Sequence, residues 1–502
     1  MSTVPAREKV LYLPIVRGFY DRELTRSAVA AVRSATSELS LAGVFPGPAA
    51  GGDGLIQSDA DFEAYWAEWR GQLYDIKALV VLSGDFMQER RAMDAVRLLP
   101  EDVPVFLLVH NDDPSDMAPG RAGDSLCGSF SVHHNVRMLG RRMVRSARLD
   151  LSQPDIVRRT LAAWQRIMDG VEAWRGMRVA MLGVNPSEFA TTFTNQAELF
   201  RLGVSLHPYE LLDFWGDTVL SANPQAALAL GGIKLRQPIA VDDPRIATVR
   251  EQAAGILDTT AMPPATFETM ARCFLWIKDV FERDRIDAGA IHCWPEFGRY
   301  FGMAPCAFAM LANALLRKPV VCEVDLCHAV MARLAWVMTG NAGVILDFNN
   351  NGWEPRVLNV FHCSQTPPNW LRDKGVACRT GQVEGTIRPG AFTGVSAATS
   401  ADACHATVFR GAFLREAPPV RGSSGWAFVP NLPAVLEAVQ NTTIHHFVAF
   451  EGDVAAELVD VLRFRGVQVA DLSCELRSLD EIEAELGGQG KTDRRRPAVY
   501  PV

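Results

Sequence analysis

Three short segments of the chain bring together side chains that could support chemistry. They are residues 291–302 (IHCWPEFGRYFG), 320–328 (VVCEVDLCH) and 443–450 (TIHHFVAF). Together they supply carboxylates, imidazoles and a tryptophan beside apolar runs. A carboxylate next to an apolar run is costly unless it is paired, hydrogen-bonded or bound to a cation. Two carboxylates and one imidazole form a mixed oxygen and nitrogen ligand set that suits a divalent ion such as Mn²⁺.

The carboxylates of two segments follow runs of strand length. Glu296 comes just after residues 288–293, and Asp325 closes residues 320–325. In open α/β sheets, ligands bind at the carboxyl ends of the strands. If 320–325 is one strand, Glu323 and Asp325 lie on the same face because side chains alternate along a strand. Each motif also has a structural explanation: a salt bridge for Glu296, a solvated surface for the Glu-x-Asp pair and a structural role for the two histidines.

The elements that must position these residues alternate between strand and helix over the first two thirds of the chain. Continuous apolar runs are typical of strands buried on both faces of a parallel sheet, and amphipathic stretches between them predict helices. The predicted strands are residues 9–14, 78–83, 103–110, 178–184, 202–207, 288–293 and 320–325. This pattern indicates βαβ architecture.

After Asp347 the pattern changes to short β-like pieces separated by Gly, Pro and Asn, which favours an antiparallel or barrel-like domain. We therefore predict an α/β protein with two Rossmann-like α/β domains, residues 1–175 and 176–345, followed by a β-rich, barrel-like domain, residues 346–502 with His446. No GxxxxGK[ST] or GxGxxG sequence follows a strand, so a nucleotide site has no support.

Composition excludes several classes of protein. The chain has 502 residues, of which 48% are hydrophobic and 22% charged, as in ordinary globular proteins. Its net charge of −8 argues against nucleic-acid and anionic-membrane partners. The basic cluster Arg494, Arg495 and Arg496 is expected to be a solvated tail. Ten cysteines without a CxxC pair, no signal-peptide pattern and no apolar run long enough to span a bilayer predict a cytoplasmic protein with reduced thiols.

Four stretches of sequence resemble the L-fucose isomerase and L-arabinose isomerase superfamily. They are CWPEFGRYFGMAPC, EVDLCHAVMARLAWVMTGNAGVILDFN, NVFHC and IHHFVAF, all between residues 291 and 450. The resemblance implies a metal-dependent aldose–ketose isomerase that works through an enediol. It also implies that Mn²⁺, or another divalent cation such as Mg²⁺ or Co²⁺, is held by Glu296, Asp325 and His446.

The same resemblance implies roles for other residues. Glu296 and Asp325 would be the catalytic acid and base as well as metal ligands. His446 is preferred over His445 because the related arabinose isomerases use the second histidine of their pair. Substrate contacts are expected from Arg17, Trp294 and His362, and Arg17 would reach the site of a neighbouring subunit. The family's assembly implies a homo-oligomer, by resemblance a hexamer.

The chain departs from the family in length and in motif detail, so the sugar does not carry over. It reads TTIHH where arabinose isomerases have GGAHH. The substrate is left open as a hexose, a pentose or a modified, possibly sulfonated sugar similar to sulfoquinovose. Two other functions stay open: a metal-dependent sugar epimerase or lyase, and a non-catalytic sugar-binding protein.

Overall fold

The computed structural model describes residues 6–48, 50, 52–117, 122–211, 239–363, 365–418 and 421–488. The basic cluster Arg494, Arg495 and Arg496 lies outside these ranges. The chain divides into two compact units, residues 1–172 and 173–502. Among the helices described here, none combines the length and apolarity needed to cross a bilayer.

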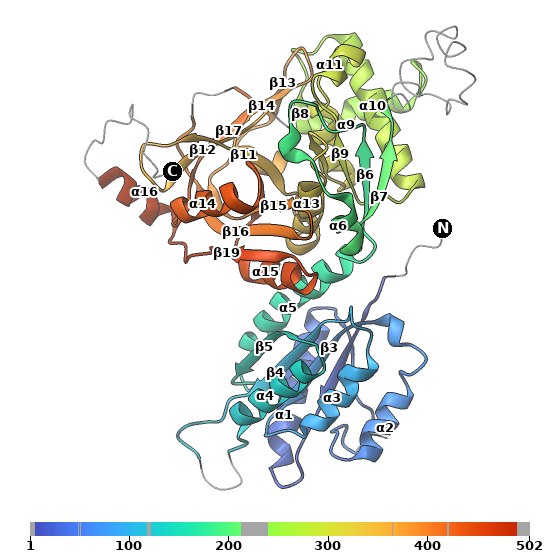
Figure 1. The fold of residues 1–502 in the computed structure, drawn as a ribbon, viewed down its shortest axis with the longest axis vertical. Coiled ribbons are helices and arrows are strands. Elements are labelled where there is room, and N and C mark those ends of the chain that lie inside the picture. Colours follow the sequence, from blue (N-terminus) through green and yellow to red (C-terminus); the bar gives the residue numbers. More distant parts are fainter. Residues whose placement is uncertain are drawn as a thin grey trace. The chain divides into compact units, whose positions relative to one another are not determined.

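The first unit is a parallel α/β domain (Figure 1). Its five parallel strands lie in the order β2-β1-β3-β4-β5. The strands are β1 (Lys9–Pro14), β2 (Ala42–Val44), β3 (Ile76–Ser83), β4 (Val105–His110) and β5 (Met143–Leu149). The helices are α1 (Arg22–Glu38), α2 (Asp59–Ala67), α3 (Glu89–Leu98), α4 (Ser125–Met138) and α5 (Pro154–Trp174).

Alternation along the strands gives this sheet two buried faces. Leu11 and Leu13 of β1 share a core with apolar residues of α2, α3 and α4. On the other face, Phe106 of β4 packs against Trp164 of α5, with ring centroids 4.9 Å apart. The predicted parallel α/β architecture is therefore confirmed, but the strand order is of the flavodoxin type and not the 3-2-1-4-5-6 order of a Rossmann fold.

The second unit begins with a four-stranded parallel sheet in the order β10-β9-β6-β7. Its strands are β6 (Arg178–Leu182), β7 (Ser205–Tyr209), β9 (Ala288–Ile291) and β10 (Val320–Cys322). The helices around it are α6 (Gln196–Arg201), α9 (Arg245–Ile256), α10 (Pro264–Arg283), α11 (Glu296–Phe301), α12 (Cys306–Leu311) and α13 (Leu326–Thr339). The carboxyl ends of β6, β9 and β10 carry most of the residues discussed below.

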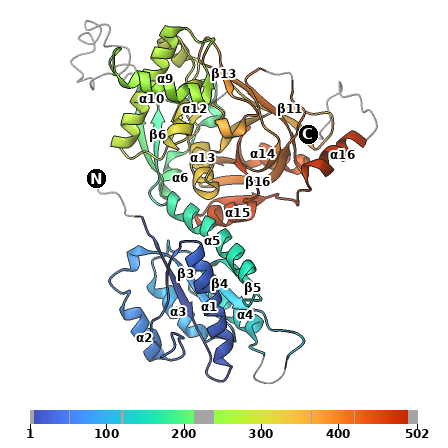
Figure 2. The same ribbon diagram turned by 180° about the vertical axis from the view of Figure 1, so that it is seen from behind.

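The same unit contains a closed antiparallel barrel, which confirms the β-rich C-terminal prediction (Figure 2). The pairings run β16-β15-β18-β11-β12-β17 and return to β16. The strands are β11 (Val344–Asn351), β12 (Val357–His362), β15 (Gly390–Thr399), β16 (Cys404–Phe413), β17 (Ser423–Phe428) and β18 (His446–Glu451). Full closure leaves none of these strands with an unpaired edge.

Four short strands extend the sheet beyond the barrel, and three helices accompany it. The strands are β8 (Leu257–Asp258), β13 (Gly375–Ala377), β14 (Val383–Thr386) and β19 (Gln468–Asp471); the helices are α14 (Leu432–Thr442), α15 (Ala455–Phe464) and α16 (Leu479–Gly488). One hydrophobic core joins Ile291 of the parallel sheet to Leu346 and Phe447 of the barrel. Because this core includes residues from both sides of position 345, the domain boundary expected there stays a prediction.

Candidate metal centre

A strained turn forms the site where β10 ends and α13 begins. Glu323 and Val324 both have positive φ, 62° and 55°. Asp325 is the N-cap of α13, and its side chain accepts the backbone N–H of His328 at 3.1 Å. Because β10 stops at Cys322, alternation along a strand does not apply to the residues that follow. The expectation that Glu323 and Asp325 share one strand face is therefore wrong.

The turn is held by two polar side chains from the loop after β6. Asn185 donates from Nδ2 to the carbonyl oxygens of Glu323 and Val324, at 3.2 Å each. The Thr192 hydroxyl donates to the same carbonyl of Glu323 at 3.0 Å. A left-handed backbone is unfavourable for residues other than glycine, most of all for a β-branched residue such as Val324. These hydrogen bonds offset that cost and hold the backbone from which the Glu323 side chain projects.

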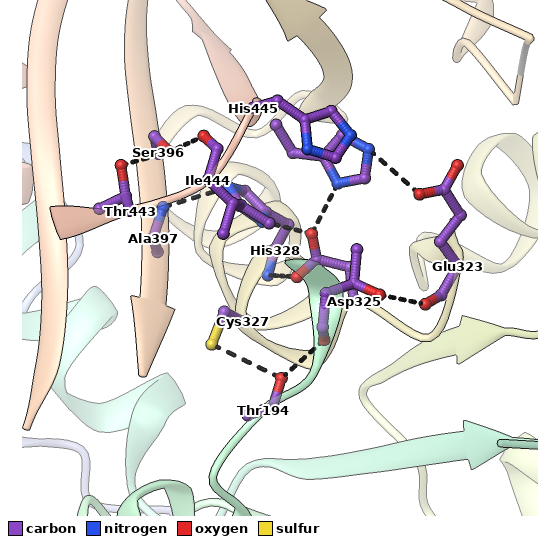
Figure 3. A network of polar contacts seen from close by, with 12 residues as sticks. Thr194, Glu323, Asp325, Cys327, His328, Ser396, Ala397, Thr443, Ile444 and His445 are labelled. Carbon is purple, nitrogen blue, oxygen red and sulfur yellow. Dashed lines mark hydrogen bonds and ion pairs between the residues drawn. The ribbon is translucent and has the colours of Figure 1, made fainter. Parts of the chain in front are cut away.

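One side of the His446 imidazole is bound to Asp325. His446 is the first residue of β18 and is fully buried, and its Nδ1 lies 2.8 Å from Oδ2 of Asp325. The same oxygen lies 2.6 Å from Nδ1 of His328. His328 in turn accepts the backbone N–H of Ala397 at Nε2, at 3.2 Å, so its ring proton is on Nδ1. Figure 3 shows Asp325 beside His328, with Glu323 on its other side.

The other side of the imidazole faces two carboxylates without a hydrogen bond. Nε2 of His446 lies 3.2 Å from Oδ1 of Asp347 and 3.5 Å from Oε2 of Glu323. Asp347 is placed there because it stands opposite His446 in the pairing of β11 with β18. Among the described residues, Nε2 of His446 and Oε2 of Glu323 are buried without a hydrogen-bond partner. A histidine that binds a metal typically has one nitrogen hydrogen-bonded to a carboxylate, as Nδ1 is here, which leaves the other nitrogen for the ion.

His362 and His445 complete the surroundings. One ligand atom each from Glu323, His362 and His446 fall within 4.8 Å of one another, and so do atoms of Asp347, His445 and His446. The His362 ring is buried and lies 5.8 Å from that of His446, centroid to centroid. The His445 side chain is 39% exposed. The structure therefore places His446 inside the cluster and His445 at its rim.

The pKa values of these groups are shifted by burial and by one another. Burial raises the pKa of Asp325, but His328 and His446 outweigh it and hold that pKa below the usual range. Burial likewise raises the pKa of Asp347, and its contact with His446 reverses the sign and lowers it. In Glu323 burial dominates, so its pKa stays raised in spite of His446 and His362. The region is thus a dense set of opposite charges, with Glu323 least compensated.

The histidines show the converse effect. Burial lowers the pKa of His446, but Asp325 and Asp347 raise it well above its ordinary value. Burial also lowers the pKa of His362, but Cys363 and Asp347 outweigh this effect and raise the pKa to about 9. In His445, burial and the nearby charge of His446 outweigh the opposing effect of Asp347 and lower the pKa to about 4.

The structure brings Asp325 and His446 together but places Glu296 elsewhere. Glu296 is the first residue of α11, and its Oε2 lies 2.5 Å from Nε2 of His292. That contact is the main reason why the pKa of Glu296 is lowered. Among the described residues, none of the groups with three ligand atoms within 4.8 Å includes Glu296. Trp294, nearby in the turn before α11, is 49% exposed and meets Phe189 edge to face at 6.0 Å.

Glu296 lines a cavity of about 560 Å³ at the carboxyl ends of the parallel strands. The loops after β6, β7 and β9 surround it with Gly183, Val184, Asn185, Ser187, Glu210, Leu211, His292, Glu296 and Tyr300. It lies where the strand order of this sheet reverses, which is the usual place for a ligand in such folds. Asn185 both lines the cavity and holds the Glu323 turn, so the two places are adjacent.

Arg17 belongs to the first unit. Its guanidinium donates to the carbonyl of Met87 at 3.0 Å and lies 3.3 Å from Oε2 of Glu89. It also stacks over the Phe86 ring at 4.4 Å. These contacts hold the side chain on the surface of the domain to which it belongs.

Sequence reasoning did not single out Asp347. The signal was present, since Asp347 follows the apolar residues of VIL within a strand, and a carboxylate in that position needs a partner. Glu323 was noted for its place beside Asp325 but was not among the expected ligands. The strained turn between Glu323 and Asp325 could not be predicted from the residue types, because neither Glu323 nor Val324 is a glycine.

Parts of the chain are similar to known proteins. A family model described as the fucose/sulfoquinovose isomerase N-terminal domain matches residues 12–175. This match supports a relationship of the chain to the fucose isomerase-like superfamily. Two proteins named sulfoquinovose isomerase, from Priestia aryabhattai and Priestia megaterium, are each 25% identical to this chain over 203 residues. The match covers 39% of this chain and 40% of each relative, so the chain spans about two fifths of the length of the curated relatives it matches.

Proposed function

We propose that this chain is a divalent-cation-dependent aldose–ketose isomerase whose ion is held by Glu323, Asp347 and His446. One observation carries the proposal. The buried Nε2 of His446 has no hydrogen bond, although it lies 3.2 Å from Asp347 and 3.5 Å from Glu323. Two carboxylates that approach one buried imidazole nitrogen without hydrogen-bonding it are suited to a cation, and this mixed oxygen and nitrogen set favours Mn²⁺, with Mg²⁺ or Co²⁺ as alternatives.

This ligand set replaces two of the three residues expected from the resemblance. His446 stays a ligand. Asp325 is 1% exposed and already accepts hydrogen bonds from both histidines, so we assign it the positioning of His446. A carboxylate in that place fixes the ring tautomer and keeps Nε2 free. Glu296 is proposed as a group of the adjacent cavity.

The chemistry requires a proton to move between C1 and C2 of the sugar and another between its two neighbouring oxygens. When bound, the cation would supply positive charge for the negative charge that builds on those oxygens. A group that transfers protons has to reach the substrate. The side chains of Glu323 and Asp347 are 12% and 23% exposed, whereas that of Asp325 is closed off. We therefore assign proton transfer to Glu323 or Asp347.

Sugar contacts are proposed for residues around the cluster. His362 lies beside His446 and can hydrogen-bond a hydroxyl group. Glu296 and His292 line the cavity, where polar groups would orient a polyol. Trp294 offers an exposed ring on which the apolar face of a sugar can stack. Arg17, in the first unit, would act in a homo-oligomer, by resemblance a hexamer, in which it serves a neighbouring subunit.

The substrate proposed is a hexose, a pentose or a sulfonated sugar. The sulfonated class is included because the two Priestia relatives are named sulfoquinovose isomerase. Incubation of the protein with Mn²⁺ and a panel of aldoses, sulfoquinovose among them, followed by NMR in D₂O, tests the proposal. Ketose formation supports it. Deuterium at C2 without ketose would indicate an epimerase, new cleavage products would indicate a lyase, and binding without exchange would indicate a sugar-binding protein.

A further inference from the structure

Four of the ten cysteines meet at one place beside the proposed metal centre. The thiol of Cys322 adjoins those of Cys293 and Cys363, and the thiol of Cys363 also adjoins that of Cys306. Three are buried and Cys363 is partly exposed. The sequence separates these residues by up to 70 positions, so the fold, and not local spacing, gathers them. Nothing in the proposed isomerase chemistry uses a thiol.

An imidazole joins this cysteine group. His362 is the last residue of β12 and Cys363 follows it, and Sγ of Cys363 lies 3.8 Å from Nδ1 of His362. Cys322 is the last residue of β10. One ligand atom from each of Cys322, His362 and Cys363 fall within 4.8 Å of one another. In a tetrahedral site with Zn–S bonds of about 2.3 Å, ligand atoms stand roughly 3.8 Å apart. A small contraction of the observed group would reach that geometry.

We infer that Cys322, Cys363 and His362 form a second cation site, of the thiolate type, for a soft ion such as Zn²⁺ or Cd²⁺. Sulfur and imidazole select such ions, whereas the carboxylate-rich cluster at Nε2 of His446 suits harder ones. Cys306 is the residue placed to add a further sulfur, since its thiol donates to the carbonyl of Cys363 at 3.9 Å. Binding releases the thiol protons to the solvent, with no change in oxidation state.

The position of this site gives it a consequence for the neighbouring one. Cys322 immediately precedes Glu323, and His362 belongs to both groups of converging ligand atoms. A soft ion that engages Nδ1 of His362 would withdraw that ring from its place beside His446. We therefore expect zinc or cadmium at the thiolate site to weaken Mn²⁺ binding at the other.

Titration with Cd²⁺ of protein saturated with Mn²⁺ tests the inference. The background carries Cys127→Ser and Cys474→Ser, which remove two exposed thiols. We expect one equivalent of Cd²⁺ to produce the ultraviolet thiolate-to-metal charge-transfer band, and Cys363→Ser or Cys322→Ser to abolish it. The matched control is Cys404→Ser, which alters a buried thiol that adjoins Cys327, outside the cysteine group, and should leave the band unchanged.

A second measurement needs no variant in the cluster. A ¹¹³Cd NMR resonance in the range of sulfur ligation is expected from the background protein, because the carboxylate cluster contains no sulfur. Absence of both the band and such a resonance would overturn the inference, as would a band that survives in Cys322→Ser and Cys363→Ser. Neither readout depends on a sugar, so the result stands whether or not the protein proves to be an isomerase.

Discussion

Asp325 holds His446 by the nitrogen that does not face the other carboxylates: its Oδ2 lies 2.8 Å from Nδ1, while Nε2 points to Asp347 and Glu323. The ring therefore separates two kinds of acidic group. Asp325 orients the imidazole through Nδ1, whereas Asp347 and Glu323 lie near Nε2, where the ion is proposed. This division of roles leads to different expectations for substitutions that otherwise look alike.

Removal of a converging carboxylate should remove the cation. We expect Glu323→Gln and Asp347→Asn each to lower Mn²⁺ affinity by more than the roughly 10–100-fold typical of an outer residue. Isothermal titration calorimetry measures this directly. Glu296→Gln is the matched control, because Glu296 binds His292 instead, and its Mn²⁺ affinity should stay unchanged. Loss of binding in Glu296→Gln with retention in Glu323→Gln would restore the ligand set expected from the family resemblance.

Neutralisation of the orienting carboxylate should weaken the site without destroying it. In Asp325→Asn the amide keeps the size of the side chain but can present a donor to Nδ1 of His446, which permits the wrong tautomer. We expect Mn²⁺ affinity to fall roughly 10–100-fold. Calorimetry on this variant beside Glu323→Gln provides the measurement. If Asp325→Asn bound Mn²⁺ as tightly as the parent, the orienting role would be refuted.

Protons and the cation should compete for His446. Burial lowers the pKa of His446, but Asp325 and Asp347 raise it overall. A histidine with a raised folded-state pKa stabilises the metal-free fold fully below about pH 6.5, and that contribution is lost as pH rises through the folded-state pKa. A cation at Nε2 displaces the proton, so Mn²⁺ affinity should increase with pH. Calorimetry in buffers of different ionisation enthalpy should detect proton release; affinity independent of pH would argue against His446 as a ligand.

The hydrogen bonds that hold the strained turn should also affect the ion. Thr192→Val removes the hydroxyl that donates to Glu323 and keeps the shape of the side chain. The loss of one hydrogen bond, about 1 kcal/mol, corresponds to about a fivefold weaker Mn²⁺ affinity if it displaces Glu323. Thr192→Ser retains the hydroxyl and should restore the parent affinity. A purely structural role would lower the melting temperature of Thr192→Val and leave its Mn²⁺ affinity as in the parent.

Close packing in the barrel gives a prediction about stability. Gly394 stands opposite Phe409 in the pairing of β15 with β16. A Cβ atom added at Gly394 would lie 2.3 Å from Cζ of that ring. We expect Gly394→Ala to reduce the free energy of unfolding by about 1–3 kcal/mol. Gly255 in α9 has nothing within 4 Å of an added Cβ, so Gly255→Ala should raise it by about 0.5–1 kcal/mol. Urea denaturation of both variants compares them.

The architecture was predictable because its signals are local. Apolar runs such as residues 78–83 and 103–110 indicate buried parallel strands, and β3 and β4 are confirmed there. The change of pattern after Asp347 indicated the β-rich domain. The strand order was not predictable, because it depends on which face each crossover helix covers.

The candidate site was predictable only in part. Residue types located the neighbourhoods of Asp325 and His446. The pairing of Asp347 with His446 arises from the register of β11 and β18, which lie about a hundred residues apart in sequence. The strained turn at Glu323 is held by hydrogen bonds to Asn185 and Thr192, which are also distant in sequence. Glu296 was favoured by the resemblance and by its place after a predicted strand, and neither signal contains information about these two contacts.

Closure of the barrel also bears on how the chain avoids associating with itself through its sheets. The ten-stranded sheet ends at β19, which has four residues, and at β8, which has two. Long exposed edges recruit strands from other chains and seed aggregates, and short edges are a common defence. The longest strands in the described part of the chain, β15 and β16, have ten residues each and are paired on both sides. The segments most capable of templating a fibril are thus the ones that the ring of strands protects.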